Sequence, residues 1–127
     1  MIERITAPGA PAPKGPYSHA VRAGDFIFVS GQGPIDPVSN QPMLGDAASE
    51  TRQTLENIRA ILRASGAEVA DVVKCSVFLT NIGDFAAMNQ VYAEFFGDTK
   101  PARTTVEADL PLRGSKVEID CVAYKKR

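Results

Sequence analysis

Histidine, cysteine and tryptophan are scarce in this chain. Its 127 residues include one histidine, His19, two cysteines and no tryptophan. A zinc site in a protein takes most of its four ligands from His and Cys, so this composition excludes such a centre. A single histidine also gives little support to a Ser-His-Asp triad. We therefore expect no metal site, and we expect His19 to be a strand or loop residue rather than a catalytic base.

The chain has neither an excess of positive charge nor a long apolar run. Its 14 Lys and Arg residues are balanced by 15 Asp and Glu residues, which gives a net charge of −1. Nucleic acids and anionic membranes bind basic surfaces, so neither partner is expected. No segment approaches the ~18 apolar residues of a membrane span, and residues 1–17 lack the apolar stretch of a signal peptide. A cytoplasmic location is the expectation.

The two cysteines, Cys75 and Cys121, each lie in an apolar stretch typical of a strand. Two cysteines at this long spacing form neither a metal pattern nor a disulfide framework. We expect both thiols to be buried and reduced, in agreement with a cytosolic setting.

Length and hydrophobic periodicity predict one α+β domain over residues 1–127. Residues 7–16 hold four of the nine prolines, so they are expected to be extended or flexible and not helical. The predicted order after them is two strands, a helix, a strand, a helix and two strands. These elements are a pair of strands around the turn Ala23-Gly24-Asp25, a helix over 46–65, a strand over 72–80, a helix over 85–96, and strands over 102–108 and 116–124.

Both predicted helices are amphipathic. Asp46 and Asp84 are their expected N-caps, and Gly66 and Gly97 follow their last turns. In the first helix, a stripe of Thr51, Leu55, Ile58 and Leu62 is expected to face the core, with Ala48 and Ile61 beside it. The charged residues, which are expected mostly outside this stripe, are Glu50, Arg52, Glu56, Arg59 and Arg63.

The predicted sheet has apolar residues on both faces. Val73, Cys75, Val77 and Leu79 are expected on one face of the strand over 72–80. Phe78 is then left on the opposite face, together with Val122 and Tyr124 of the last strand. Two helices can cover only one side of such a sheet, so we predict a homo-oligomer that covers the other.

Tyr17, Arg103, Glu118 and Asn89 remain as candidates for chemistry. Each also has a structural interpretation, as a core residue, a surface ion pair or a solvated polar position. Arg103 and Glu118 are expected on adjacent terminal strands. The fork of an arginine fits a carboxylate bidentately. Arg103 therefore either pairs with Glu118 or holds the carboxylate of a ligand, which leaves Glu118 free to act on a water or a proton.

Seven stretches, in order along nearly the whole chain, form a recognisable set. They are GPYSHA at 15–20, FVSGQ at 28–32, TRQTLENI at 51–58, DVVKCSVFLT at 71–80, DFAAMNQVYAEFF at 84–96, PARTTVE at 101–107 and VEIDCVA at 117–123. Together they resemble the Rid family, the YjgF-like enamine/imine deaminases that are also called L-PSP endoribonucleases.

This resemblance implies a chorismate-mutase-like fold, a mixed sheet with two helices on one face. It also implies a homotrimer whose sheets form a central barrel, with ligand clefts between subunits. Members of the family hydrolyse reactive enamines and imines, such as 2-aminoacrylate and its imine tautomer, to a 2-oxo acid and ammonia, and they need no cofactor. The expected ligands are therefore small 2-imino and 2-oxo carboxylic acids.

The resemblance also assigns roles to single residues. Arg103 corresponds to the arginine that binds the substrate carboxylate, and Glu118 to the glutamate that positions the water. The other residues implied in the cleft are Tyr17, Gly31 and Asn89. Thr105 stands in a substrate-binding position where the family usually has cysteine, and His19 stands where it usually has glutamine. Both departures bear on substrate preference more than on the type of reaction.

Two alternatives to an imine deaminase remain. The first is a module that binds carboxylate metabolites without turnover, but such a module has no use for Glu118 beside an anionic ligand. The second is RNA cleavage, against which the lack of a basic surface and of a histidine pair both argue.

Overall fold

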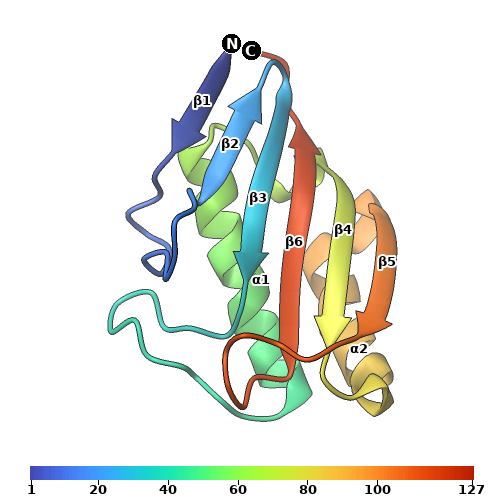
Figure 1. Ribbon diagram of the computed structural model, residues 1–127. Coiled ribbons are helices and arrows are strands. Elements are labelled where there is room, and N and C mark those ends of the chain that lie inside the picture. The colour runs from blue at the N-terminus through green and yellow to red at the C-terminus, as the bar shows by residue number, and fades with distance from the viewer.

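Six strands form one mixed sheet, and two helices cover one of its faces (Figure 1). The computed structural model describes residues 1–127. The strand order is β1-β2-β3-β6-β4-β5, with all neighbours antiparallel except the parallel pair β4 and β5. The strands are β1 (Ile2–Ile5), β2 (Ala20–Ala23), β3 (Phe26–Gln32), β4 (Val72–Leu79), β5 (Ala102–Glu107) and β6 (Val117–Tyr124). The predicted α+β class and the covering of one face are confirmed.

The helices begin and end close to their predicted bounds. Helix α1 spans Ala47–Ala64, and the Asp46 carboxylate accepts the Ser49 N–H at 2.8 Å as an N-cap. Gly66, with φ of +81°, follows in the left-handed region that glycine favours. Helix α2 spans Phe85–Phe96, but the predicted cap Asp84 makes no capping hydrogen bond with its side chain. Neither helix has the length and hydropathy to cross a bilayer.

The hydrophobic core lies between the helices and the covered face of the sheet. Ile27, Val77 and Ile119 of the central strands form one buried cluster there with the apolar residues of α1. Cys75 and Cys121 occupy paired positions on β4 and β6, and both are buried free thiols, as predicted. Burial raises the pKa of the Cys75 thiol to about 11, so it stays protonated and unreactive at neutral pH.

Three local expectations were wrong or incomplete. A register shift between Val72 and Lys74 turns Val72 into the core and leaves Val73 45% exposed, so Val73 does not share a face with Cys75. Glu50 is completely buried on α1 although its charge suggested an exposed position. Strand β1 was not predicted, because its four residues are exposed or only partly buried and show no clear alternation.

The uncovered face of the sheet is half apolar, as the sequence predicts. Phe26, Phe28, Val106 and Tyr124 are 41–48% exposed there. Phe26 and Tyr124 pack edge-to-face across β3 and β6, with ring centroids 5.1 Å apart. In Figure 1 this face looks toward the viewer and both helices lie behind the sheet. The homo-oligomer that would cover it stays a prediction.

His19 ties the proline-rich segment to the core. Its ring is 4% exposed, Nδ1 accepts the Ala7 N–H at 2.8 Å, and Nε2 lies 2.7 Å from the Pro11 carbonyl oxygen. An acceptor Nδ1 leaves the proton on Nε2, which donates it to Pro11. His19 is therefore a structural residue, as expected, and neither of its nitrogens is free for a substrate.

We predict that His19→Ala lowers the free energy of unfolding by about 2–4 kcal/mol, because it strands one buried backbone donor and one acceptor. Urea unfolding at a fixed protein concentration measures the change. Thr6→Ala, at an exposed position in the same segment, is the control and should shift the value by less than ~0.5 kcal/mol. Equal effects of the two substitutions would contradict the structural role of His19.

Candidate functional site

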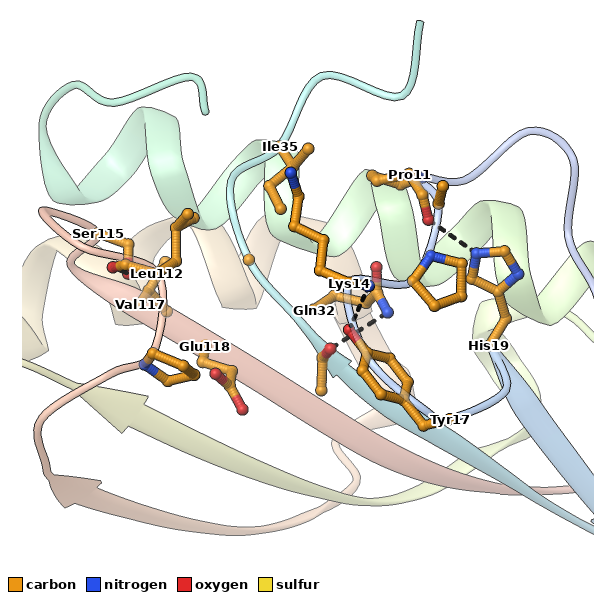
Figure 2. Close-up of a pocket in the computed structure, with 15 residues that line it drawn as sticks. Pro11, Lys14, Tyr17, His19, Gln32, Ile35, Leu112, Ser115, Val117 and Glu118 are labelled. Carbon is orange, nitrogen blue, oxygen red and sulfur yellow. Dashed lines mark hydrogen bonds between the residues drawn. The ribbon is translucent and has the colours of Figure 1, made fainter. Parts of the chain in front are cut away.

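A cavity of about 310 Å³ opens between the proline-rich segment, the end of β3 and the loop before β6 (Figure 2). Three of the predicted site residues, Tyr17, Gly31 and Glu118, line it together. Its size lies at the lower end of the range for small-molecule pockets. The structure thus brings half of the predicted site together in one chain.

Within this cavity, the Glu118 side chain lies against the backbone of Gly31. A Cβ atom on residue 31 would lie 2.5 Å from Oε2 of Glu118 and 3.1 Å from its Cδ, so a side chain there would displace the carboxylate. The pairing of β3 with β6 shifts between Val29 and Gln32, which places an irregularity of the β-bulge type at Ser30 and Gly31. Bulges often occur beside active sites, where they redirect the chain. Glycine is needed here because the carboxylate approaches the backbone closely.

The Glu118 carboxylate is half-buried and makes no hydrogen bond to the other lining residues in Figure 2. Burial raises the pKa of this carboxyl above its usual value, and the negative charge of Asp120, two residues along β6, raises it further. A carboxylate that is unpaired, adjacent to a cavity and raised in pKa is suited to accept and return a proton.

Tyr17 faces the same cavity with a hydroxyl that can donate. Its oxygen accepts the Lys14 N–H at 3.2 Å, which leaves its own proton available. The side chain is 47% exposed, so Tyr17 is not the core residue that its structural interpretation suggested. Lys14 lines the cavity too, and in Figure 2 its side chain extends toward Ile35, away from Glu118.

Arg103 lies elsewhere, on the edge strand β5. Its guanidinium carbon is 4.7 Å from the ring centroid of Tyr92 and 5.5 Å from that of Phe85. These cation–π contacts orient the side chain without neutralising its charge, since Arg103 is in no ion pair with a carboxylate of its own chain. Asn89 and Lys100 line the same shallow depression as Arg103.

The expectation that Arg103 and Glu118 lie on adjacent strands was wrong. Strand β4 separates them, because β6 inserts between β3 and β4 while β5 pairs with the outer side of β4. Arg103 pairs with the inward-facing Cys75, whereas Glu118 pairs with Phe78. Since neighbouring strand positions share a face, Arg103 lies on the helix side of the sheet and Glu118 on the uncovered side. The chain therefore places the predicted site residues in two separate groups, one around Glu118 and one around Arg103, which we call half-sites.

Thr105 belongs to the half-site of Arg103. It pairs with Val77 on β4 and faces the helix side, two residues after Arg103. Its hydroxyl oxygen is buried and has no hydrogen-bond partner. Buried hydroxyl groups are usually paired, so the unpaired hydroxyl of Thr105 is an exception within this chain.

Sequence reasoning missed several residues of the cavity. Leu112 and Ser115 come from the loop between β5 and β6, and Gln32 comes from the end of β3. No local pattern marked the loop residues, because their role depends on how the loop folds back over Gly33. The proline-rich segment gave one usable signal, since an ordered segment of this composition commonly forms a binding wall.

Comparison with known proteins identifies the family of this chain. The family model described as Endoribonuclease L-PSP matches residues 7–125. The chain belongs to this family. A RutC family protein of Pyrococcus horikoshii is 49% identical over 99% of this chain and 100% of its own length. A 2-iminobutanoate/2-iminopropanoate deaminase of Dermatophagoides farinae is 42% identical over 93% of this chain and 92% of its own.

Solved structures of the family share the fold. The crystal structure of E. coli TdcF with bound serine has a TM-score of 0.90 and 35% identity, covering 98% of this chain and 99% of its own. Rid family membership and the YjgF-like architecture, which the resemblance implied, are thereby confirmed.

The raised pKa of Glu118 predicts a pH-dependent cost in stability. Because the folded-state pKa lies above the unfolded one, the protonated form favours folding, and stability is lost as pH rises through the folded pKa. Glu118→Gln has no charge to bury, so its free energy of unfolding should exceed that of the wild type at pH 7 and approach it at pH 4.

Urea unfolding at both pH values, at one protein concentration, measures this difference. Glu94→Gln is the control, since its exposed carboxylate pairs only with the exposed Arg52 and should give no such gain. A Glu118→Gln variant that is less stable than the wild type at pH 7 would show that the carboxylate serves the fold.

Proposed function

We propose that this protein hydrolyses 2-imino carboxylic acids and their enamine tautomers to 2-oxo acids and ammonia. The reaction takes place in clefts that two copies of the chain build together within a homotrimer. The observation that carries the proposal is the division of two unpaired groups, Arg103 and Glu118, between separate surfaces of one chain. A neighbouring copy that packs on the half-apolar face would supply the missing half of each site.

Two relatives support the chemistry. The protein of Dermatophagoides farinae is named for the deamination of 2-iminobutanoate and 2-iminopropanoate, and E. coli TdcF is described with bound serine. Imino acids and serine share a carboxylate next to a carbon that bears nitrogen. An arginine without an acidic partner, such as Arg103, is suited to that carboxylate because its planar fork binds two oxygens at once.

Each residue then has a defined task. An enamine first gains a proton at its terminal carbon and loses one from its nitrogen, which converts it to the imine. Arg103 fixes the carboxylate and so places the imine carbon, while Glu118 accepts a proton from the water that adds to this carbon. Glu118 returns this proton to the imine nitrogen, which becomes the amino group of the tetrahedral intermediate. The hydroxyl proton of the intermediate then moves to this nitrogen through Glu118, the C–N bond breaks, and ammonia leaves as the C=O bond forms. Tyr17 donates a hydrogen bond to the intermediate.

The reaction needs one acid/base group and good positioning. General acid–base catalysis contributes ~10²–10⁴-fold, and Glu118 is matched to it because its raised pKa makes it a stronger base than an ordinary carboxylate. The cavity beside Glu118 has room for a substrate side chain. The family description also names an endoribonuclease. A chain with a net charge of −1 and a fully engaged His19 offers little for RNA binding or cleavage.

Glu118→Gln and Arg103→Lys should fail in different ways. Glu118→Gln removes the base but keeps the shape, so kcat should fall ~10²–10⁴-fold while a 2-oxo acid still binds. Arg103→Lys keeps the charge but loses the fork, so KM should rise roughly tenfold or more. The assay follows 2-oxo acid release from an amino acid treated with an amino-acid oxidase. Unchanged turnover in Glu118→Gln would sink the assigned role of the carboxylate.

A mixing experiment tests the shared cleft. We expect Arg103→Ala and Glu118→Gln homotrimers to be inactive, and trimers reassembled from an equal mixture to regain activity. Random assembly would restore about a quarter of the clefts, those that take Arg103 from one chain and Glu118 from its neighbour. Light scattering checks that each sample has three times the 13.6 kDa chain mass. No recovery in mixed trimers would show that the two residues do not share a site.

A further inference from the structure

Helix α1 buries a polar stripe beside its apolar one. Glu50, Thr54, Asn57 and Ile61 follow one another at the spacing of a helix face, and all four are at most 1% exposed. Buried Glu and Asn are uncommon unless their polar groups are engaged. Glu50 and Asn57, two turns apart, are both engaged with backbone outside the helix.

Glu50 holds the start of β6. Its Oε1 accepts the Lys116 N–H at 2.7 Å, and its Oε2 accepts the Gly45 N–H at 3.0 Å. The Lys116 ammonium lies 3.5 Å from Oε2 and offsets the buried charge. The Lys116 carbonyl in turn accepts the Thr80 N–H at 3.1 Å, so the backbone of residue 116 is held on both sides.

Asn57 holds the chain that leaves β3. Its Nδ2 donates to the Gly33 carbonyl at 3.1 Å and to the Ile35 carbonyl at 2.9 Å. Its Oδ1 accepts from Gln53 Nε2 at 2.9 Å, which fixes the orientation of the amide. Both polar atoms of the Asn57 side chain therefore take part in hydrogen bonds. Those to Gly33 and Ile35 hold one wall of the cavity in place.

These two residues act on either side of the contact between Gly31 and Glu118. Asn57 binds residue 33, two positions after Gly31, and Glu50 binds residue 116, two positions before Glu118. The carboxylate lies so close to Gly31 that small shifts of either strand change its position. Site geometry must be held within about 0.5 Å for efficient catalysis.

We propose that Glu50 and Asn57 are positioning residues, through which helix α1 fixes the Glu118 carboxylate against Gly31 in the catalytic geometry. The inference rests on the proposed function, since it names the residues that set the position of its base. Neither residue touches the cavity or the substrate. Their effect is on the placement of Glu118 and not on the half-site of Arg103, so kcat should respond and KM should not.

Glu50→Met and Glu50→Gln form the decisive pair. Methionine fills the space of glutamate without an acceptor, and apolar replacements of buried charges often keep stability. Glutamine retains one oxygen for the Lys116 N–H. We expect kcat to fall ~10–100-fold in Glu50→Met with KM within threefold of the wild type, and to stay within about threefold in Glu50→Gln. Glu56→Gln, at an exposed position of the same helix, is the control and should leave kcat unchanged.

If Glu50 has only a structural role, kcat should fall in proportion to the loss of stability. If it positions Glu118, kcat should fall in Glu50→Met, which lacks an acceptor oxygen for the Lys116 N–H, and not in Glu50→Gln, which keeps one. A stable Glu50→Met variant with unchanged kcat would overturn the proposal, as would a variant that does not fold. Asn57→Leu repeats the test at the other contact. It should lower kcat at constant KM, and loss of kcat in proportion to melting temperature would count against the proposal.

A second readout separates this inference from the proposed function. NMR titration of the ¹³C-labelled Glu118 carboxyl reports its surroundings without any substrate, with Asp120 as its charged neighbour. We expect the Glu118 pKa to move toward its ordinary value in Glu50→Met, because the freed strand lets water reach the carboxylate. If the wild type has no imine hydrolase activity, the proposed function fails, and an unchanged titration in Glu50→Met would independently overturn the positioning role.

Discussion

The insertion of β6 between β3 and β4 is the constraint on which the site depends. It pairs Glu118 with Phe78 on the uncovered face and brings the same residue against the bulge at Gly31. It also moves β5, with Arg103, to the edge of the sheet. A β4-α2-β5 crossover makes β4 and β5 parallel, and such a crossover must place its helix on one face. The two charged residues of the site are therefore kept apart by the topology itself.

This separation explains why both groups remain unpaired within one chain. An arginine and a carboxylate on adjacent strands would neutralise each other, and the pair would have little to offer a ligand. Here Arg103 rests on aromatic rings, and of its hydrogen-bond donors only Nη1 is engaged, in a weak bond to Met88 Sδ at 3.9 Å. Glu118 is half-buried and lies near the negative charge of Asp120, and both conditions favour its protonated form. Under the proposed function, each group is in this way available to a substrate held between two chains.

The sequence predicted the elements well and the relation between distant strands poorly. Helices 46–65 and 85–96 and the later strands follow from periodicity and glycine stops, which are local signals. The neighbours of β6 are not local, because any strand order that buries Ile119 and Cys121 satisfies the same alternation. The family motifs imply roles for Arg103 and Glu118, but they do not show on which face of the sheet each residue lies. A register shift such as the one at Val73 cannot be predicted from the sequence, because it changes which face a residue lies on without changing the apolar composition of the strand.

Glu50 shows a second limit of sequence reasoning. The residues of the predicted stripe, Thr51, Leu55, Ile58 and Leu62, are mostly apolar. The parallel stripe through Glu50 and Asn57 is polar, so hydrophobic periodicity gives no sign that it is buried. Both stripes are buried, since α1 packs on the sheet with one and on the cavity walls with the other. Composition alone cannot separate a solvated glutamate from one that accepts two backbone N–H groups.

A polar residue in phase with a core stripe is nevertheless a usable signal, because burying it costs free energy that only specific partners offset. In this chain those partners are the peptides on either side of the Gly31–Glu118 contact, so the polar stripe of the helix and the chemistry of the cavity are two parts of one arrangement.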